Sequence, residues 1–184
     1  MIRLSLNPLG GLSYSKCLFF RQTRRVSFHF VFAIVVCAGA ALTQPANAQD
    51  IVGCASVIDG DTIEIHGTRI RLFAIDAVEA SQTCTTLQGQ RWPCGREAAF
   101  ALADHLAGKT VNCRPLDTDR YGRNVARCFV GDQVIAAWSV ANGWAMARAS
   151  YSIEYMGVQR RAVSSHRGIW SGSFDDPQSF RKAQ

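Results

Sequence analysis

The stretch that most constrains the fold of this chain is residues 57–79, VIDGDTIEIHGTRIRLFAIDAVE. It consists of short runs in which apolar and polar residues alternate, separated by two turns that contain glycine, at 59–61 (DGD) and 66–68 (HGT). An Asp-Gly turn between alternating runs is a strong hairpin signal, and a second glycine turn extends the pattern. The stretch therefore predicts a three-stranded meander.

Acidic residues in this stretch follow a turn or a strand end. Asp61 follows the first turn, and Asp76 and Glu79 follow the third predicted strand. Rigid strands often position binding and catalytic groups at their ends. If Asp61 and Asp76 meet across neighbouring strands, their carboxylates suit calcium or magnesium, and a cluster that keeps several waters favours calcium. Asp59 and Thr62 are close enough to join directly or through water.

Two arginines near the acids could bind an anion. Arg71 lies on the strand that leads to Asp76, and Arg123 follows a Tyr-Gly turn. A guanidinium forks onto phosphate oxygens, which a protein that only bound a cation would not need. A carboxylate activates water, while a cation and arginines stabilise the extra charge on phosphorus. These residue types are sufficient for phosphodiester hydrolysis.

Each feature also has a structural explanation. Asp-Gly turns are commonest in plain hairpins, and Arg71 alternates with apolar residues and could face solvent. Asp76 could cap a turn, and Glu79 could be solvated. The four tryptophans are expected to pack in the core rather than to stack on bases. The order and spacing of the whole set favour a functional site.

Residues 1–48 have the composition of a cleavable signal peptide. The first 25 residues contain five basic and no acidic side chains, an apolar run covers about 26–42, and an Ala-x-Ala site ends at Ala48. The apolar run is shorter than the roughly 18 residues of a membrane span. We therefore expect cleavage after Ala48, export to the periplasm or the medium, and no stable membrane association afterwards.

Removal of that segment changes the charge of the chain. Five of the 20 Lys and Arg residues precede Ala48 and none of the 14 Asp and Glu residues does, so residues 49–184 carry a formal charge of +1. Bulk charge therefore does not indicate a nucleic-acid partner, and local basic patches would have to provide the attraction. We expect any affinity for nucleic acid to be modest and strongly salt-sensitive.

Five cysteines lie after residue 48, and export would place them in an oxidising compartment where disulfides form. Cys84 and Cys94 flank a polar loop, and Cys113 and Cys128 lie in two strand-like runs that could pair, which leaves Cys54 as the fifth. Zinc is the competing interpretation, but the chain has no Cys-x-x-Cys and no close Cys/His pair. We expect disulfides, with Cys84, Cys94, Cys113 and Cys128 as the candidates, while the connectivity and the role of Cys54 stay open at this point.

The rest of the chain alternates strands with helices, which is typical of a mixed α+β domain. Apolar spacing and glycine stops predict helices over 95–106, 134–141 and 152–166. Two short strands are expected at 110–114 and 125–130. We expect an irregular tail at 173–184.

Five ordered segments identify a family: 57–62 (VIDGDT), 71–79 (RLFAIDAVE), 119–123 (DRYGR), 143–145 (GWA) and 168–170 (GIW). Through them the chain, from about residue 51 to 170, resembles the staphylococcal nuclease (thermonuclease) family, as an exported bacterial-type member. The resemblance implies an OB-fold over 49–172, a five-stranded β-barrel with about three helices. It also implies a monomer that hydrolyses DNA and RNA with calcium.

The resemblance also implies roles for individual residues. Asp61, Asp76 and the Ala77 carbonyl would bind the calcium ion, and Asp59 and Thr62 would support its waters. The remaining roles are catalytic, for Arg71, Glu79 and Arg123, and substrate-binding, for Arg120, Tyr121 and Tyr151. Val78 stands where the family generally has proline, which implies a less rigid loop around Glu79.

Two other functional classes fit parts of the pattern. The OB-fold also hosts non-catalytic modules that bind single-stranded nucleic acid, because a fold does not fix a function. A small calcium-stabilised structural domain would keep the aspartates without needing the arginines. Since Arg71, Glu79 and Arg123 are all present beside the acids, the sequence favours the nuclease.

Overall fold

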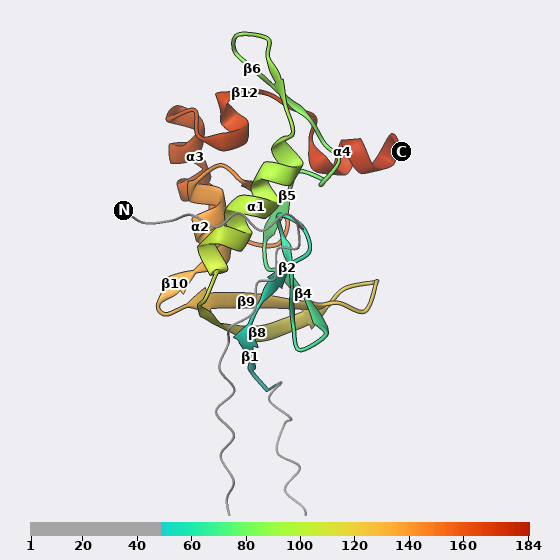
Figure 1. The fold of residues 1–184 in the computed structure, drawn as a ribbon, viewed down its shortest axis with the longest axis vertical. Helices are drawn as coiled ribbons and strands as arrows, with labels where there is room; N and C mark the ends of the chain where they lie inside the picture. Colours follow the sequence, from blue (N-terminus) through green and yellow to red (C-terminus); the bar gives the residue numbers. More distant parts are fainter. Residues whose placement is uncertain (1–48) are drawn as a thin grey trace, which may run out of the picture. The chain divides into compact units, whose positions relative to one another are not determined.

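The computed structural model describes residues 49–184 (Figure 1), and the predicted signal peptide lies outside the described residues. Among the described residues, no helix is both long and apolar enough to cross a bilayer.

The centre of the fold is a barrel built from the predicted meander and two later strands. Its strands are β1 (Ile51–Cys54), β2 (Ser56–Val57), β3 (Thr62–Ile65), β4 (Thr68–Leu72), β8 (Thr110–Thr118) and β9 (Asn124–Val130). Their order is β1-β8-β9-β4-β3-β2, antiparallel except for the β4–β9 pair. Only Ala55 separates β1 from β2, so the two form one strand that pairs with β8 through its first half and with β3 through its second. The ring closes, and the five-stranded OB barrel is confirmed.

Alternation along the strands places apolar side chains inside the barrel. Ile63 and Ile65 on β3 and Ile70 on β4 are fully buried, and they pack with Val111 and Ala126 from β8 and β9. The predicted disulfide between Cys113 and Cys128 joins directly paired residues of β8 and β9. This packing fixes the strand ends that lead into the site.

Helices cover the barrel and extend above it (Figure 1). They are α1 (Cys94–Leu106), α2 (Ile135–Ala141), α3 (Met156–Ser164) and the short 3-10 helix η1 (Gly168–Ser171). The predictions for α1 and α2 are confirmed to within one residue. Helix α3 begins four residues later than predicted, because the chain before it turns, with the N–H groups of Tyr151 and Ser152 donating to the Arg148 carbonyl.

Two smaller sheets complete the fold. Strand β5 (Ile75–Ala77) pairs with β11 (Ala145–Ala147). Strands β6 (Cys84–Thr86), β7 (Arg91–Trp92) and β12 (Gly172–Ser173) form the second sheet, while β10 (Gln133–Val134) pairs antiparallel with the end of β9. The predicted Cys84–Cys94 disulfide ties β6 to the start of α1 within a second apolar cluster that contains Val78 and Ile169.

The prediction of an irregular tail is wrong. Residues 173–184 continue from β12 into a fourth helix, α4 (Pro177–Lys182). Asp176 caps this helix by accepting hydrogen bonds from the N–H groups of Gln178 and Ser179, and Pro177 favours the first turn. The Phe174 ring packs edge-on against Trp170, with centroids 5.2 Å apart. The tail folds because Phe174 anchors it to the second apolar cluster and Asp176 caps the helix that follows.

Candidate active site

An open groove of about 1320 Å³ lies beside the barrel and is bounded by β4, β5, the β8–β9 turn, the segment after β11 and α4. Ten predicted site residues line it: Asp59, Asp61, Arg71, Asp76, Ala77, Glu79, Arg120, Tyr121, Arg123 and Tyr151. The eleventh, Thr62, is buried directly beneath, with its hydroxyl donating to an Asp61 oxygen at 3.0 Å. The fold therefore brings together residues that are up to 92 positions apart in the sequence, from Asp59 to Tyr151.

Asp61 is fixed by backbone geometry. The Asp-Gly turn carries it into the start of β3, where its own N–H donates to the Asp59 carboxylate at 2.9 Å. One of its carboxylate oxygens accepts the Ala77 N–H at 3.1 Å, so the ends of β3 and β5 are held together across this side chain. Arg71 approaches the same carboxylate at 3.1 Å from the neighbouring strand β4.

Asp76 lies on the other side of Arg71 and is surrounded by positive charge. The Arg71 Nη2 atom donates to Asp76 Oδ1 at 2.9 Å. Arg148, which follows β11, donates to Oδ2 through Nε and Nη2, and Arg181 from α4 donates to both oxygens at 3.2 and 3.0 Å. Three guanidinium groups therefore converge on one buried carboxylate.

The two aspartates differ in pKa for this reason. Burial raises the pKa of Asp61 to about 7, since the single Arg71 contact does not offset the lost hydration. Burial opposes ionisation of Asp76 as well, but hydrogen bonds from Arg181, Arg148 and Arg71 outweigh it and hold the pKa of Asp76 below its usual value. Three arginines contact the Asp76 carboxylate and only Arg71 forms an ion pair with Asp61 among the described residues, so Asp61 has a deficit of positive charge.

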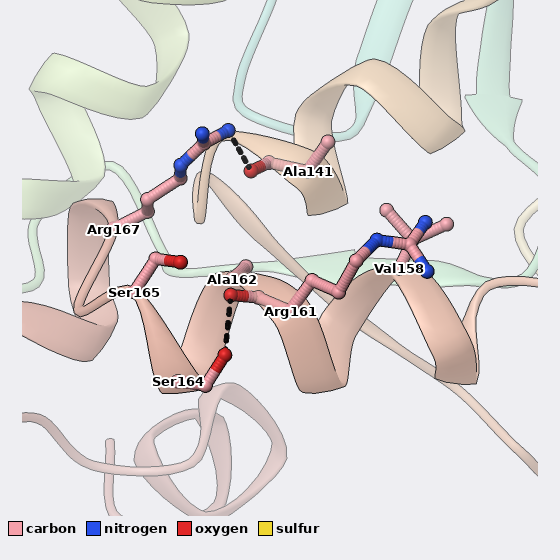
Figure 2. A pocket seen from close by; sticks show the side chains of 7 residues that line it. All are labelled: Ala141, Val158, Arg161, Ala162, Ser164, Ser165 and Arg167. Atoms are coloured by element: carbon pink, nitrogen blue, oxygen red, sulfur yellow. Dashed lines mark hydrogen bonds between the residues drawn. The ribbon is translucent and has the colours of Figure 1, made fainter.

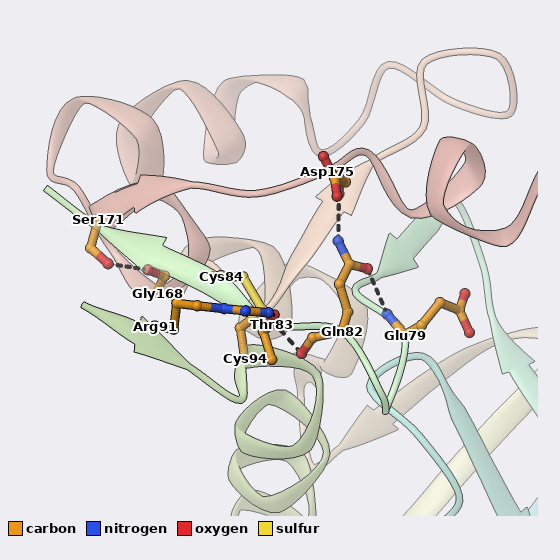
Figure 3. The surroundings of a disulfide bond; sticks show 9 residues. All are labelled: Glu79, Gln82, Thr83, Cys84, Arg91, Cys94, Gly168, Ser171 and Asp175. Atoms are coloured by element: carbon orange, nitrogen blue, oxygen red, sulfur yellow. Dashed lines mark hydrogen bonds between the residues drawn. A yellow bond between two sulfur atoms is a disulfide. The ribbon is translucent and has the colours of Figure 1, made fainter. Parts of the chain in front are cut away.

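The loop that carries Glu79 is held from three sides, and Figure 3 shows the contact with Gln82. The buried Gln82 side chain accepts the Glu79 N–H at 3.1 Å and donates to the Asp175 carbonyl of the tail at 2.6 Å. Gly95 packs so closely that an added Cβ would lie 1.7 Å from the Glu79 carbonyl oxygen. Arg181 donates to the Glu79 carboxylate. Buried contacts thus fix the backbone of Glu79, and its carboxylate faces the groove.

The β8–β9 turn brings in a further arginine and an exposed ring. The Asp119 carboxylate accepts hydrogen bonds from the N–H groups of Tyr121 and Arg123 and from Arg123 Nε at 2.7 Å. Arg123 also donates to the Thr62 hydroxyl at 3.5 Å, which orients its guanidinium towards Asp61. The Tyr121 ring is exposed, with the Arg120 and Arg123 guanidinium groups 4.8 and 5.5 Å from its centroid.

The donor set fits a hard divalent cation. The Arg71 Nη2 atom lies 3.1 Å from an Asp61 oxygen and 2.9 Å from an Asp76 oxygen, so positive charge already bridges the two carboxylates. Oxygen ligands of this kind, completed by water, suit calcium or magnesium. In residues 49–184 no three His, Cys, Asp or Glu side chains converge as a complete ligand set, so water and backbone oxygens would have to supply the remaining ligands. Ala77 contributes its N–H to Asp61, and its carbonyl as a ligand stays a prediction.

Comparison with known proteins identifies the family. A sequence profile described as "Staphylococcal nuclease homologue" matches residues 69–172, more than half of the chain. This chain belongs to the staphylococcal nuclease family. The cluster of acids and arginines therefore lies in a groove beside the β-barrel of a nuclease-family fold.

Individual relatives agree with the profile. The chain is 40% identical over 139 residues to the succinoglycan biosynthesis protein ExoI of Rhizobium meliloti, covering 73% of each protein. It is 32% identical to an uncharacterized endonuclease of Escherichia coli, over 69% of this chain and 82% of that protein. It is 30% identical to the thermonuclease of Staphylococcus intermedius, over 62% of this chain and 72% of that protein.

Three residues of the site were missed by sequence reasoning: Gln82, Arg148 and Arg181. Arg148 directly follows a strand, and Asp176-Pro177 is a helix start, so both positions carried a usable signal. Gln82 is a single buried glutamine, and no sequence pattern predicts its role. Arg181 lies beyond residue 172, where the match to the nuclease family profile ends.

A second, smaller hollow of about 250 Å³ provides a contrast (Figure 2). Arg161 and Arg167 line it beside Ser164 and Ser165, and Arg167 donates to the Ala141 carbonyl. None of its lining residues is acidic. Of these two hollows, the groove alone combines carboxylates for a cation with arginines for an anion.

Proposed function

We propose that this protein is a calcium-dependent nuclease that hydrolyses phosphodiester bonds of DNA and RNA in the groove. Its membership of the family supports phosphodiester hydrolysis and nucleic-acid substrates. The observation that carries the proposal is the convergence of Asp61, Asp76, Glu79, Arg71 and Arg123 on one groove.

The cation site is proposed to consist of Asp61, Asp76 and the Ala77 carbonyl, with Asp59 and Thr62 holding the surrounding waters. Support comes from the bridging position of Arg71 between the two aspartates and from the charge deficit at Asp61. A bound cation would supply positive charge to the phosphate and lower the energy of the extra negative charge on phosphorus.

Glu79 is the proposed general base and takes the proton from the attacking water. Its carboxylate faces the groove on a fixed backbone, which is the geometry that proton transfer requires. Arg71 and Arg123 donate to the phosphate oxygens and stabilise the negative charge that grows as water attacks phosphorus. Their forked donors suit this role better than lysine would.

Substrate contacts outside the reacting phosphate are proposed for Arg120, Tyr121 and Tyr151. All three line the groove, and the two tyrosines are exposed. An exposed aromatic ring stacks on a nucleobase without a strong sequence preference. We further propose that the protein is exported and acts as a monomer. The disulfides support the export, since they form in oxidising compartments.

The alternative is a non-catalytic module that binds nucleic acid. Such a module would not need a carboxylate fixed at Glu79 beside two aspartates and two arginines. The Rhizobium relative is named a succinoglycan biosynthesis protein, and that name specifies no reaction for the present chain.

A cleavage assay tests the proposal. The purified protein is incubated with single-stranded DNA, double-stranded DNA or RNA in calcium, magnesium or chelator, beside Glu79→Gln and a matched control, Glu64→Gln, on β3 outside the groove. We expect calcium-dependent cleavage that Glu79→Gln abolishes and Glu64→Gln leaves intact. Binding without cleavage by the folded wild-type protein would establish the alternative.

A further inference from the structure

Helix α4 adds a polar, basic face to the groove. Gln178, Arg181 and Lys182 line it, at spacings of three and four residues that place them on one side of the helix. Since α4 lies beyond the family match, the proposed function gives it no role.

The arginines around Asp76 leave little room for a cation. A carboxylate offers about four lone-pair positions, and Asp76 already accepts five hydrogen bonds from Arg71, Arg148 and Arg181. A cation that binds Asp76 must therefore displace at least one of these donors.

Arg181 is the donor that the structure holds least firmly. Its side chain is 41% exposed, against 23% for Arg71 and 20% for Arg148. It stands on a six-residue helix, whereas Arg71 lies in the barrel wall. Arg148 has a second acceptor in Asp176. Within residues 49–184, the side-chain hydrogen bonds of Arg181 go to Asp76 and Glu79, the acids that the proposed reaction needs.

Charge determines where Arg181 moves. A divalent cation at Asp61 and Asp76 adds two positive charges beside this guanidinium, so the arginine is repelled unless an anion arrives with the cation. A nucleic acid supplies such an anion at every phosphate. Arg71 and Arg123 are taken up by the reacting phosphate in the proposed mechanism, which leaves a neighbouring phosphate for Arg181.

We propose that Arg181 is a substrate-binding residue that occupies Asp76 and Glu79 in the free protein and transfers to a backbone phosphate of the nucleic acid when the cation binds. Its release frees Glu79 to act as a base. Cation and nucleic acid then favour each other's binding, since each favours the released arginine. This inference rests on the proposed nuclease function and adds a substrate contact to it.

The first test measures calcium binding without nucleic acid, by isothermal titration of the full protein. Arg181→Ala removes a competitor for Asp76, so we expect calcium to bind about threefold to tenfold more tightly than in the wild type. Arg160→Ala is the control, because Arg160 is exposed on α3 and does not line the groove. Arg181→Gln, which removes the charge but keeps a long polar side chain on α4, repeats the test if the alanine variant does not fold.

The second test measures binding of a cleavage-resistant phosphorothioate oligonucleotide in calcium at several salt concentrations. We expect Arg181→Ala to weaken binding about threefold to tenfold and to reduce the slope of log K against log salt by about 0.7, the value for one phosphate of a single strand. Arg160→Ala should match the wild type.

Opposite effects on the two ligands support the inference, because loss of a purely structural contact would weaken both. Weaker calcium binding in Arg181→Ala and Arg181→Gln, or unchanged oligonucleotide binding, overturns it. Cleavage by the wild type with no effect of Arg181 overturns this inference alone. Opposite effects in a protein that never cleaves overturn the proposed hydrolysis and leave Arg181 as a binding residue.

Discussion

The barrel wall and the C-terminal segment, residues 172–184, contribute to the same groove by different physical means. Asp61 on the barrel side is buried and held by the Ala77 N–H, while Arg71 lies on the adjacent strand. On the C-terminal side, Arg181 is partly exposed, and its side chain is held by ion pairs with Asp76 and Glu79. Buried backbone hydrogen bonds fix a group in one position, whereas exposed ion pairs exchange partners at small cost. We infer that the barrel defines the reaction centre and the C-terminal segment responds to the ligand.

The same substitution in both regions gives the largest predicted contrast. Arg71→Lys removes a forked donor from the barrel wall and should lower kcat about 10²–10³-fold, as the loss of a transition-state donor does. Arg181→Lys should change kcat less than about threefold and act mainly on KM, because it binds a phosphate that does not react. Steady-state kinetics on single-stranded DNA measure both, with Arg114→Lys as an exposed control outside the groove. Equal losses of kcat would remove the distinction between the regions.

The two disulfides separate stability from activity. Each closes a short loop, of 10 or 15 residues, so replacing either pair by serine should lower the free energy of unfolding by about 3 kcal/mol. Loss of Cys84–Cys94 should also slow cleavage, since it loosens the start of α1 against the Glu79 loop. Loss of Cys113–Cys128 should leave the rate per folded molecule unchanged. Denaturant unfolding and cleavage below the unfolding transition measure the two effects, and a rate loss in the Cys113–Cys128 variant would contradict the assignment.

Asp61 gives a pH-dependent prediction for the cation-free protein. Its pKa in the folded state is raised to about 7, so folding opposes its ionisation, and this residue destabilises the protein progressively as pH rises from about 4 to 7. Asp61→Asn should therefore stabilise the chelator-treated protein at pH 7.5 by on the order of 2 kcal/mol and change little at pH 4. Saturating calcium should reverse the order at pH 7.5, since only the wild type keeps the proposed ligand. Denaturant titrations with and without chelator measure this, and a destabilised Asp61→Asn without cation would contradict it.

The smallest predicted effect concerns Gln82, which links the two regions by bonding both Glu79 and Asp175. Gln82→Ala should lower kcat about tenfold and leave KM nearly unchanged, because Glu79 loses its anchor while substrate contacts remain. Gln90→Ala is a control, because Gln90 is exposed in the neighbouring loop that the Cys84–Cys94 disulfide closes. If KM rises as strongly as kcat falls, Gln82 supports the substrate groove as a whole.

The barrel side was predictable from the sequence because its signals are local and repeated. Alternation and the Asp-Gly turn fixed the register of the meander, and this register pairs Thr62 with Arg71, which brings the neighbouring Asp61 close to Arg71. The two strand-like runs made Cys113 and Cys128 a candidate pair, and the structure joins them. Family resemblance then supplied roles that composition could not.

The C-terminal side was missed because its order depends on distant contacts. Residues 173–184 have no long apolar period, and α4 folds through the Asp176 cap and the Phe174–Trp170 contact. Val78 implied a looser Glu79 loop, yet it is buried in the second apolar cluster and the loop is anchored through Gln82. No sequence pattern reports a single buried side chain that bridges two loops.

The most direct measurement of the central claim is the initial rate of single-stranded DNA cleavage by the wild-type protein as free calcium is raised from chelated to millimolar levels. We predict no cleavage in chelator, a saturable rise with calcium, and loss of that rise in Asp76→Asn, which removes a proposed ligand. Cleavage that persists in chelator, or a calcium response that survives in Asp76→Asn, would contradict the assignment of this groove as the cation-dependent reaction centre.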